Sequence, residues 1–271
     1  MLPTLEEIAS WTKEAGEILR EGFGQKHEVT HKSAIDLVTE MDRRSEDFLL
    51  GKIRQNFSGH SILSEESGSF AGDEESQWYV DHLDGTINYS HDIPIYCVSV
   101  AYSYKGELTL AAISNPMVDE HFIAERGKGV WLNGKPIHVS QTEDLMNSLL
   151  VTGFPYDVQT TPRNNLDHFG YFTRRSQGVR RFGSAAIDLC YVAAGRFDGY
   201  WELGIKPWDI AAGILMVEEA GGKVSDLAGG KDYFKPPFAL VAANPPMHAK
   251  LLSELVASDK LTLKGKQRNK K

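Results

Sequence analysis

Two aspartates three positions apart, Asp81 and Asp84, are the residues of this sequence best placed to do chemistry. They follow an apolar run at 78–80 that is typical of a buried strand. Two carboxylates at the end of such a strand cannot both be buried without a counter-charge, because an isolated buried anion is unfavourable or shifts its pKa. A hard divalent cation such as Mg²⁺ resolves that conflict, since it prefers oxygen ligands and is often held by a few carboxylates plus substrate phosphates.

Gly85 and Thr86 follow directly and complete the turn. Gly85 lets the backbone approach a ligand closely, and Thr86 can open a helix whose free N–H groups attract an anion. The alternative is an Asx-type turn with solvated acids. The Asp-x-x-Asp-Gly-Thr pattern alone does not decide between the two.

The elements that must position this turn begin with an amphipathic helix. Thr4 and Glu7 form a capping box at its start, and the helix ends near Gly24. A strand is expected at 27–31, a polar loop at 32–36 and a second helix capped by Thr39. A short strand at 62–63 leads to the next acids, and 68–75 reads as a surface loop. Long β-like runs follow at 95–104, 107–113, 120–124 and 129–132, the last closed by a two-residue turn at 133–134.

The first half, about 4–140, is therefore expected to lay helices on an antiparallel sheet. After a polar link at 141–147, helices at 162–174, 185–194 and 208–220 alternate with strands at 149–151, 200–202, 223–225 and 239–243. That alternation predicts a mixed-sheet α/β half at about 148–257. The fold class predicted for the single domain at 4–257 is α/β (α+β), a layered αβαβα sandwich. Residues 258–271 are polar and basic and are expected to form a disordered tail, although such a tail could instead touch acidic partners.

Composition excludes several classes of function. The formal net charge of −8 argues against a nucleic-acid-binding protein, which would be basic. No apolar run approaches the roughly 20 residues of a membrane span, and the N-terminus lacks the pattern of a secretory signal. Cys97 and Cys190 lie in apolar surroundings and are expected to be buried thiols. We therefore expect a cytoplasmic protein that binds neither nucleic acid nor membrane.

Three motifs in order give the chain a family resemblance. The motifs are spread over most of the sequence: Ser64-Glu65-Glu66-Ser67, the turn at 81–86, and Trp208-Asp209 with the following Ile-Ala-Ala-Gly. On these motifs the chain resembles the inositol monophosphatase family of Mg²⁺-dependent, lithium-sensitive phosphatases. His82 departs from the pattern, because the family usually has proline there; the change loosens the turn but removes no ligand.

The resemblance implies two or three Mg²⁺ ions in the site. Glu65, Asp81 and the Leu83 carbonyl would hold one ion, and Asp81, Asp84 and Asp209 a second; Glu65 would also help to place a weaker third. Thr86 would orient the attacking water beside Glu65.

Two further residues have a family role and a plainer alternative. Asp42 would accept a hydrogen bond from Thr86, or simply be a first-turn acid of its helix. Lys32 would balance phosphate charge near the metals, or be a solvated lysine.

The resemblance also implies the substrate contacts. The N–H groups of Gly85 and Thr86 would bind phosphate, and the residues that would contact the inositol are Gly183, Ser184, Ala185, Glu202 and Asp209. A carboxylate at Glu202 suits hydroxyl groups, because it accepts their hydrogen bonds, and it would disfavour a second phosphate.

We therefore expect a phosphomonoesterase that hydrolyses myo-inositol monophosphate to inositol and phosphate with metal-activated water, and the resemblance suggests a homodimer. The nearest alternative is a fructose-1,6-bisphosphatase or a broader sugar or polyol phosphatase on the same fold. A regulatory binding protein with a vestigial site is the alternative from another class. The intact set of converging carboxylates argues against it.

Overall fold

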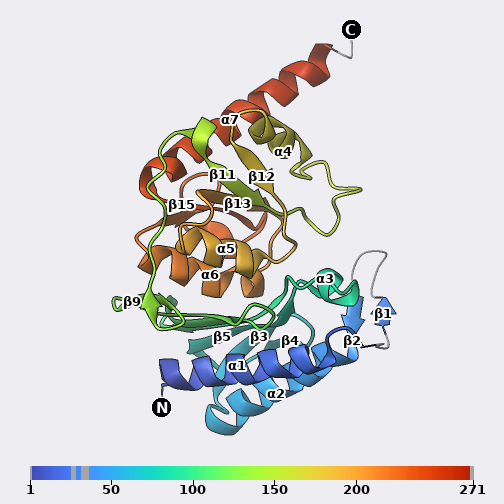
Figure 1. Cartoon of the computed structure of the whole chain (residues 1–271), viewed down its shortest axis with the longest axis vertical. Helices are drawn as coiled ribbons and strands as arrows, with labels where there is room; N and C mark the ends of the chain where they lie inside the picture. The colour runs from blue at the N-terminus through green and yellow to red at the C-terminus, as the bar shows by residue number, and fades with distance from the viewer. Residues whose placement is uncertain (1, 26–28, 32–36, 269–271) are drawn as a thin grey trace.

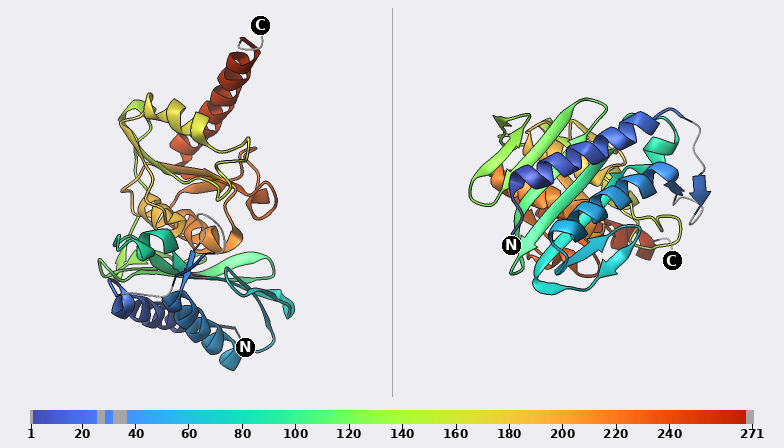
Figure 2. Two further views of the ribbon diagram at one scale, coloured as in Figure 1. Left: turned by 90° about the vertical axis from the view of Figure 1, so that its right-hand side faces the viewer. Right: turned by 90° about the horizontal axis from the view of Figure 1, so that it is seen from below.

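The protein folds into five alternating layers of helix and sheet (Figures 1 and 2). The structure is a computed structural model that describes residues 2–25, 29–31 and 37–268, with side chains for 2–25 and 40–261. Helices α1 (Leu5–Gly22) and α2 (Glu40–Asn56) cover the outer face of an eight-stranded sheet, and α5 (Ala185–Ala193) and α6 (Pro207–Glu219) pack on its inner face. A five-stranded sheet follows, covered by α4 (Leu166–Thr173) and α7 (Pro245–Arg268). The predicted αβαβα sandwich is confirmed.

The first helix begins where its capping residues place it. The Thr4 hydroxyl accepts a hydrogen bond from the Glu7 backbone N–H at 3.3 Å, and the Glu7 carboxylate accepts from the Thr4 N–H at 2.8 Å. Both bonds satisfy helix N–H groups that would otherwise lack partners. The apolar face of α1 then packs Ile8, Ala15 and Leu19 against the sheet.

The eight-stranded sheet has the order β10-β9-β8-β7-β6-β5-β3-β4. Its strands are β3 (His60–Ser64), β4 (Gly68–Phe70), β5 (Asp73–Asp84), β6 (Cys97–Tyr104), β7 (Glu107–Asn115), β8 (Glu120–Glu125), β9 (Gly129–Leu132) and β10 (Lys135–Pro136). The expectation of an antiparallel sheet is wrong at one pair, because β3 runs parallel to β5. This parallel pairing brings the end of β3, which leads to Glu65, beside the end of β5, which carries Asp81 and Asp84.

One local prediction in this half differs from the structure. The segment at 68–75 is not a loop, since β4 pairs with β3 and β5 already begins at Asp73. β4 is an edge strand, and its small and polar residues lack the apolar pattern by which a buried strand is predicted. Thr39 ends strand β2 (Leu37–Thr39), which pairs with β1 (Val29–His31), and it directly precedes α2, the helix it was predicted to cap. The hairpin turn is confirmed, with Asn133 and Gly134 both at positive φ.

The five-stranded sheet is mixed, as predicted, in the order β12-β11-β13-β15-β14. The strands are β11 (Leu149–Thr152), β12 (Gly178–Arg180), β13 (Gly199–Leu203), β14 (Lys223–Ser225) and β15 (Ala239–Ala243). β11 pairs in parallel with β12 and β13, and β15 pairs antiparallel with β13 and β14. The short edge strand β12 was not predicted.

One hydrophobic core joins the two halves. Ile113 and Phe122 of the first sheet, Ile187 and Ile214 of the central helices and Leu240 of the second sheet all belong to it. The central helices are therefore apolar on both faces, which is the pattern of a helix buried between two layers.

The C-terminal segment corrects another expectation, because α7 continues to Arg268 where a disordered tail was predicted to begin at 258. Ser258 is buried, and Asp259 lies 2.9 Å from the ring Nε2 of His168. These contacts tie the start of the predicted tail to α4.

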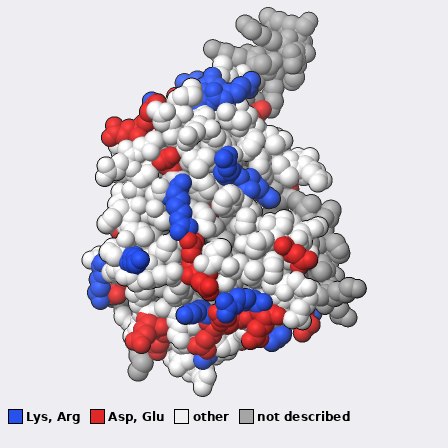
Figure 3. All heavy atoms as spheres, viewed as in Figure 1, with Lys and Arg blue, Asp and Glu red and all other residues white. Residues whose placement is uncertain are grey.

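The surface carries acidic and basic side chains side by side where α1 lies, at the lower edge of Figure 3. Arg20 pairs there with Glu17 and, at 3.2 Å, with Asp119. Both cysteines are free and buried, as predicted. Across the described ranges, no helix has the length and apolarity needed to cross a membrane.

Candidate active site

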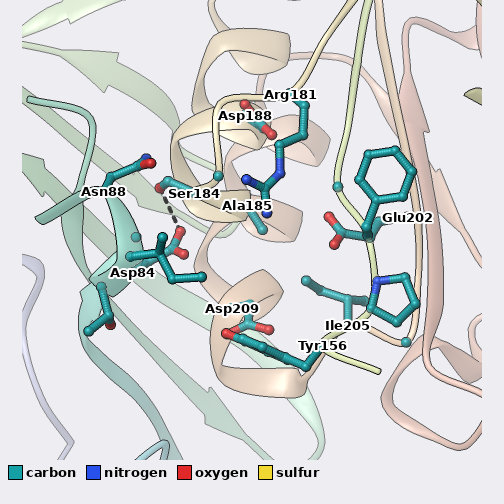
Figure 4. Close-up of a pocket in the computed structure, with 18 of the residues that line it drawn as sticks. Asp84, Asn88, Tyr156, Arg181, Ser184, Ala185, Asp188, Glu202, Ile205 and Asp209 are labelled. Atoms are coloured by element: carbon teal, nitrogen blue, oxygen red, sulfur yellow. Dashed lines mark hydrogen bonds between the residues drawn. The ribbon is translucent and has the colours of Figure 1, made fainter. Parts of the chain in front are cut away.

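A pocket lies where the end of β5 meets the first residues of α3 (Thr86–Ser90), α5 and α6 (Figure 4). Its lining includes Glu65, Asp84, Gly85, Thr86, Asn88, Gly153, Tyr156, Arg181, Gly183, Ser184, Ala185, Asp188, Glu202 and Asp209. The N-termini of α5 and α6 direct the positive ends of their dipoles towards this region. Residues more than a hundred positions apart in the sequence therefore face one another across a single cavity.

Asp84 is fixed by the start of α5. Its Oδ2 accepts hydrogen bonds from the Ser184 hydroxyl and the Ala186 N–H, both at 2.7 Å. Burial raises the pKa of Asp84 to about 6, against the lowering effect of these two bonds. The carboxyl group is held in one orientation, but its charge is only partly offset.

Asp81 lies three residues before Asp84 on β5 and is 1 % exposed. Its Oδ1 accepts a hydrogen bond from the Leu83 N–H at 3.1 Å. Burial raises its pKa well above the usual range, and the nearby charges of Glu65, Asp84 and Asp209 raise it further. Asp81 is thus surrounded by the acids expected to share metal ions with it.

Asp209 reaches the site from the first turn of α6. Pro207 supplies the first helical residue, and Asp209 Oδ2 accepts from the Lys206 N–H at 2.9 Å. Burial raises the pKa of this carboxyl well above its usual range, followed by the repulsion of Glu65 and Asp84. The predicted placement of Asp209 on a rigid helix start agrees with the structure.

These carboxyls fit a cation. Asp81, Asp84 and Asp209 are each buried and each destabilised in the charged form, and Asp81 and Asp209 also repel Glu65. Bringing several such groups together as anions requires compensating positive charge. All the side-chain donors are oxygens, the ligand type that Mg²⁺ prefers.

Thr86 lies between two acceptors. Its hydroxyl donates to the Leu83 carbonyl at 3.0 Å, and its distance to Asp42 Oδ1 is 3.5 Å. The shorter contact is with Leu83, so the expected partner, Asp42, is the more distant one. Asp42 is nevertheless buried at 1 % exposure and faces the threonine.

His82 turns its ring towards the same carboxylate. Its Nε2 lies 3.7 Å from Asp42 Oδ1, and one ligand atom each from Asp42, Glu66 and His82 lie within 4.8 Å of one another. Burial alone would lower the pKa of His82, but Asp42, Glu65 and Glu46 raise it overall. A histidine at the usual proline position thus adds a potential positive charge behind Thr86.

Glu202, from β13, is on the opposite wall. The Tyr200 hydroxyl donates to its Oε2 at 2.5 Å, and burial raises its pKa to about 7. The carboxyl group packs directly on the Cα of Gly153, where a Cβ would overlap its oxygens. Gly153 therefore creates the space in which Glu202 can face the cavity.

The glycines expected at the phosphate and polyol positions have conformations that suit them. Gly85 has φ +98°, and a Cβ there would approach the Ile95 carbonyl oxygen to 2.9 Å. Gly183 has φ +82°, directly before Ser184, which caps α5. Asn88, for which no role was predicted, donates to the Ile95 and Phe182 carbonyls and so joins two loops of the pocket.

Sequence reasoning missed several lining residues, among them three with ionisable side chains: Tyr156, Arg181 and Asp188. Asp188 follows Ser184 by four positions, a helical spacing that could have placed both on one face of α5. Tyr156 and Arg181 lie in irregular segments, where no periodic pattern indicates direction. Lys32 falls outside the described residues.

Comparison with known proteins identifies the protein family to which the chain belongs. The sequence profile of the inositol monophosphatase family matches residues 2–260. The chain is 44% identical over 245 residues to an inositol-1-monophosphatase of Synechocystis, covering 87% of this chain and 83% of the relative. It is 38% identical over 258 residues to the Nus factor SuhB of Escherichia coli, covering 94% and 96% of the two chains.

A solved structure of an inositol monophosphatase from Anabaena superimposes with a TM-score of 0.85. It shares 41% identity and covers 93% of this chain and 95% of its own. The chain belongs to the inositol monophosphatase family. It is a phosphatase, and its family is one of metal-dependent phosphatases.

Proposed function

We propose that this phosphatase is a Mg²⁺-dependent phosphomonoesterase that hydrolyses myo-inositol monophosphate to inositol and phosphate. The observation that carries the proposal is the convergence of Glu65, Asp84 and Asp209 on one cavity whose opposite wall presents Glu202. One end of the cavity suits metal ions and a phosphate, and the other suits hydroxyl groups.

The metal ligands would be those expected from the motifs. Glu65, Asp81 and the Leu83 carbonyl would hold one ion, Asp81, Asp84 and Asp209 a second, and Glu65 would assist a third. Bound Mg²⁺ supplies positive charge that polarises the phosphoryl oxygens and activates water. Asp84 and Asp209 would enter this arrangement already oriented, because helix starts hold both carboxyls.

The remaining steps belong to the side chains and backbone. The N–H groups of Gly85 and Thr86 would bind the phosphate oxygens. The Thr86 hydroxyl would orient the attacking water beside Glu65. The same hydroxyl would donate its hydrogen to Asp42 once the distance between Thr86 Oγ1 and Asp42 Oδ1 shortens from 3.5 Å. Catalytic hydrogen bonds are often long before substrate binds.

The polyol would lie between the start of α5 and Glu202. Gly183, Ser184 and Ala185 form one side of that space, with Asp209 beside it and Glu202 opposite. A carboxylate there would accept hydrogen bonds from ring hydroxyls. We further propose that the protein acts in the cytoplasm as a homodimer on small phosphate esters, without nucleic-acid or membrane partners.

Arg181 favours a second candidate, a sugar bisphosphatase such as a fructose-1,6-bisphosphatase. It is the one basic side chain among the described residues that line the pocket, and it attracts the Glu202 carboxylate. A second phosphate would meet this guanidinium as well as Glu202, so the repulsion expected from Glu202 alone is reduced.

Phosphate release from a panel of esters tests the proposal. The panel contains myo-inositol 1-phosphate, fructose 1,6-bisphosphate and phenyl phosphate, each with Mg²⁺ and with excess chelator. We expect Mg²⁺-dependent release with the highest kcat/KM for the inositol ester. A preference for the bisphosphate would favour the second candidate, and full activity in chelator would exclude the metal mechanism.

A further inference from the structure

Asp188, which the proposed chemistry does not use, lies in the wall of the pocket. Its side chain is 1 % exposed, and its Oδ1 is buried without a hydrogen-bond partner in the part of the chain that the structure describes. Buried polar atoms are nearly always satisfied in native proteins, because an unmade hydrogen bond is costly. An unsatisfied oxygen in a ligand pocket therefore points to a group that arrives with the ligand.

The position of Asp188 is fixed by the helix that holds Asp84. Ser184 caps α5 and donates to Asp84, and Asp188 follows one turn later on the same face. Figure 4 shows Asp188 beside Arg181, with Glu202 across the cavity. Asp188 therefore lies farther along α5 from Asp84 than Ser184 does, on the side expected to hold the leaving group.

Arg181 supplies positive charge near Asp188 and Glu202 but forms no ion pair with either among the described residues. Burial, followed by the charges of Glu202 and Asp84, raises the pKa of Asp188, and the guanidinium offsets part of this rise, as it does for the pKa of Glu202. Among the described residues, no ion pair within 4.0 Å joins it to either carboxylate. The Asp188 Oδ1 atom, and the part of the Glu202 carboxylate that does not accept from the Tyr200 hydroxyl, consequently remain available to a ligand.

We propose that Asp188 is a specificity-determining residue that accepts a hydrogen bond from a hydroxyl of the leaving group. Glu202 binds one hydroxyl and Asp188 another, so the favoured substrates are phosphate esters of cyclic polyols or sugars with at least two hydroxyls away from the ester. The inference rests on the proposed function and names the chemistry that selects its substrate.

A hydroxyl suits this region better than a charged group. An anionic substituent would be attracted by Arg181 but repelled by the two carboxylates, and an amine would be attracted by the carboxylates but repelled by Arg181. A hydroxyl donates the missing hydrogen bond and adds no charge.

The test compares Asp188→Ala and Asp188→Asn with wild type on myo-inositol 1-phosphate and phenyl phosphate at fixed Mg²⁺. Asp188→Ala should raise KM for the inositol ester about tenfold, as for the loss of one hydrogen bond to a charged acceptor. The KM for phenyl phosphate and the kcat for both esters should stay within about twofold. Asp188→Asn should recover part of the loss, because its amide oxygen still accepts a hydrogen bond. Asp167→Asn, an exposed carboxylate on α4, is the matched control.

Two further measurements separate this inference from the proposed function. Thermal unfolding in chelator should show Asp188→Ala at least as stable as wild type, because it removes an unsatisfied buried carboxyl; a purely structural residue would destabilise. Calorimetry of free myo-inositol with phosphate and Mg²⁺ should show weaker binding by the variant, even if wild type released no phosphate from any ester. An unchanged ratio of the two KM values together with unchanged inositol binding would overturn the role of Asp188.

Discussion

The Asp84 carboxyl group accepts the Ala186 backbone N–H at 2.7 Å, which ties the end of the first sheet to the start of α5 in the second half. The same oxygen accepts the Ser184 hydroxyl. A proposed metal ligand is thus also a link between the two halves, and this double role shapes what its substitution should do.

Asp84→Asn should lower kcat by orders of magnitude while the fold remains intact. The amide oxygen can still accept from Ala186, but the site loses one of the charges that attract Mg²⁺. Removal of a repelling buried carboxylate should leave the metal-free protein as stable or more stable. Phosphate release and thermal unfolding in chelator measure the two effects, and an active variant would remove Asp84 from the ligand set.

Chelation of wild type should abolish activity, and added Mg²⁺ should restore it. Burial raises the pKa values of Asp81, Asp84 and Asp209, and neighbouring carboxylates raise those of Asp81 and Asp209 further. A bound ion would relieve this destabilisation of the charged forms and should therefore also stabilise the fold. Unfolding temperature against Mg²⁺ concentration reports binding independently of turnover. A temperature insensitive to Mg²⁺ would contradict a site formed by these acids.

Thr86→Ala should lower kcat about 10²-fold or more with little change in KM, in the range expected for a lost positioning group. The variant removes the hydroxyl that donates to Leu83 and faces Asp42, but keeps every proposed metal side chain. Thr86→Ser retains the hydroxyl and should keep much of the rate. Equal losses in both variants would show that the hydroxyl is not the group that matters.

Gly153→Ala should weaken discrimination for polyol esters. The added methyl would overlap the Glu202 carboxylate, so that side chain must move from its place beside Tyr200. We expect a raised KM for inositol monophosphate, an unchanged phenyl phosphate rate and a stability loss of about 1–3 kcal/mol from overpacking. Gly170→Ala on α4 is the control, since its Cβ would meet no atom within 4 Å. Unchanged kinetics would mean that the position of Glu202 does not select substrate.

Glu202→Gln should stabilise the metal-free protein in a pH-dependent manner. The folded-state pKa of Glu202 is about 7 against an ordinary 4.5, so the folded protein holds this proton more tightly than the unfolded chain. The free energy of unfolding therefore falls as pH rises from about 4.5 to about 7, by a few kcal/mol at most. The variant lacks this loss, so its advantage over wild type should be present at pH 8 and absent at pH 4.

Unfolding temperatures of both proteins in chelator across that range provide the measurement. Glu143→Gln, an exposed carboxylate in the link between the halves, should show no such trend. A difference between Glu202→Gln and wild type that does not change with pH would contradict the raised pKa.

Glu202→Gln also tests substrate choice. Loss of the charge should raise KM for inositol monophosphate and relatively favour the bisphosphorylated sugar. The effect on the bisphosphate should be modest, because Arg181 already offsets part of the Glu202 charge. Equal slowing of the inositol ester, the bisphosphate and phenyl phosphate would show that Glu202 does not select among them.

Most helices and strands could be predicted because they leave local patterns, whereas the set of acids expected to converge was implied by the family resemblance of three motifs. The capping box at Thr4, the turn at Asn133 and the proline before Trp208 each indicate a particular local backbone geometry. The parallel pairing of β3 with β5 could not be predicted, since pairing partners depend on long-range contacts. Arg181 and Tyr156 were missed for a related reason: loop residues acquire their direction only when two distant segments meet.

The central helix layer has a consequence for the order in which the protein can be made. Asp81 and Asp84 leave the ribosome more than a hundred residues before α5 and α6 are complete, and both helices bury their faces against sheets from the two ends of the chain. A nascent chain that stops before residue 184 carries the paired aspartates without the start of α5, whose Ser184 hydroxyl and Ala186 N–H orient Asp84. Assembly of the proposed site is therefore a late event of synthesis, because its residues come from both halves of the chain.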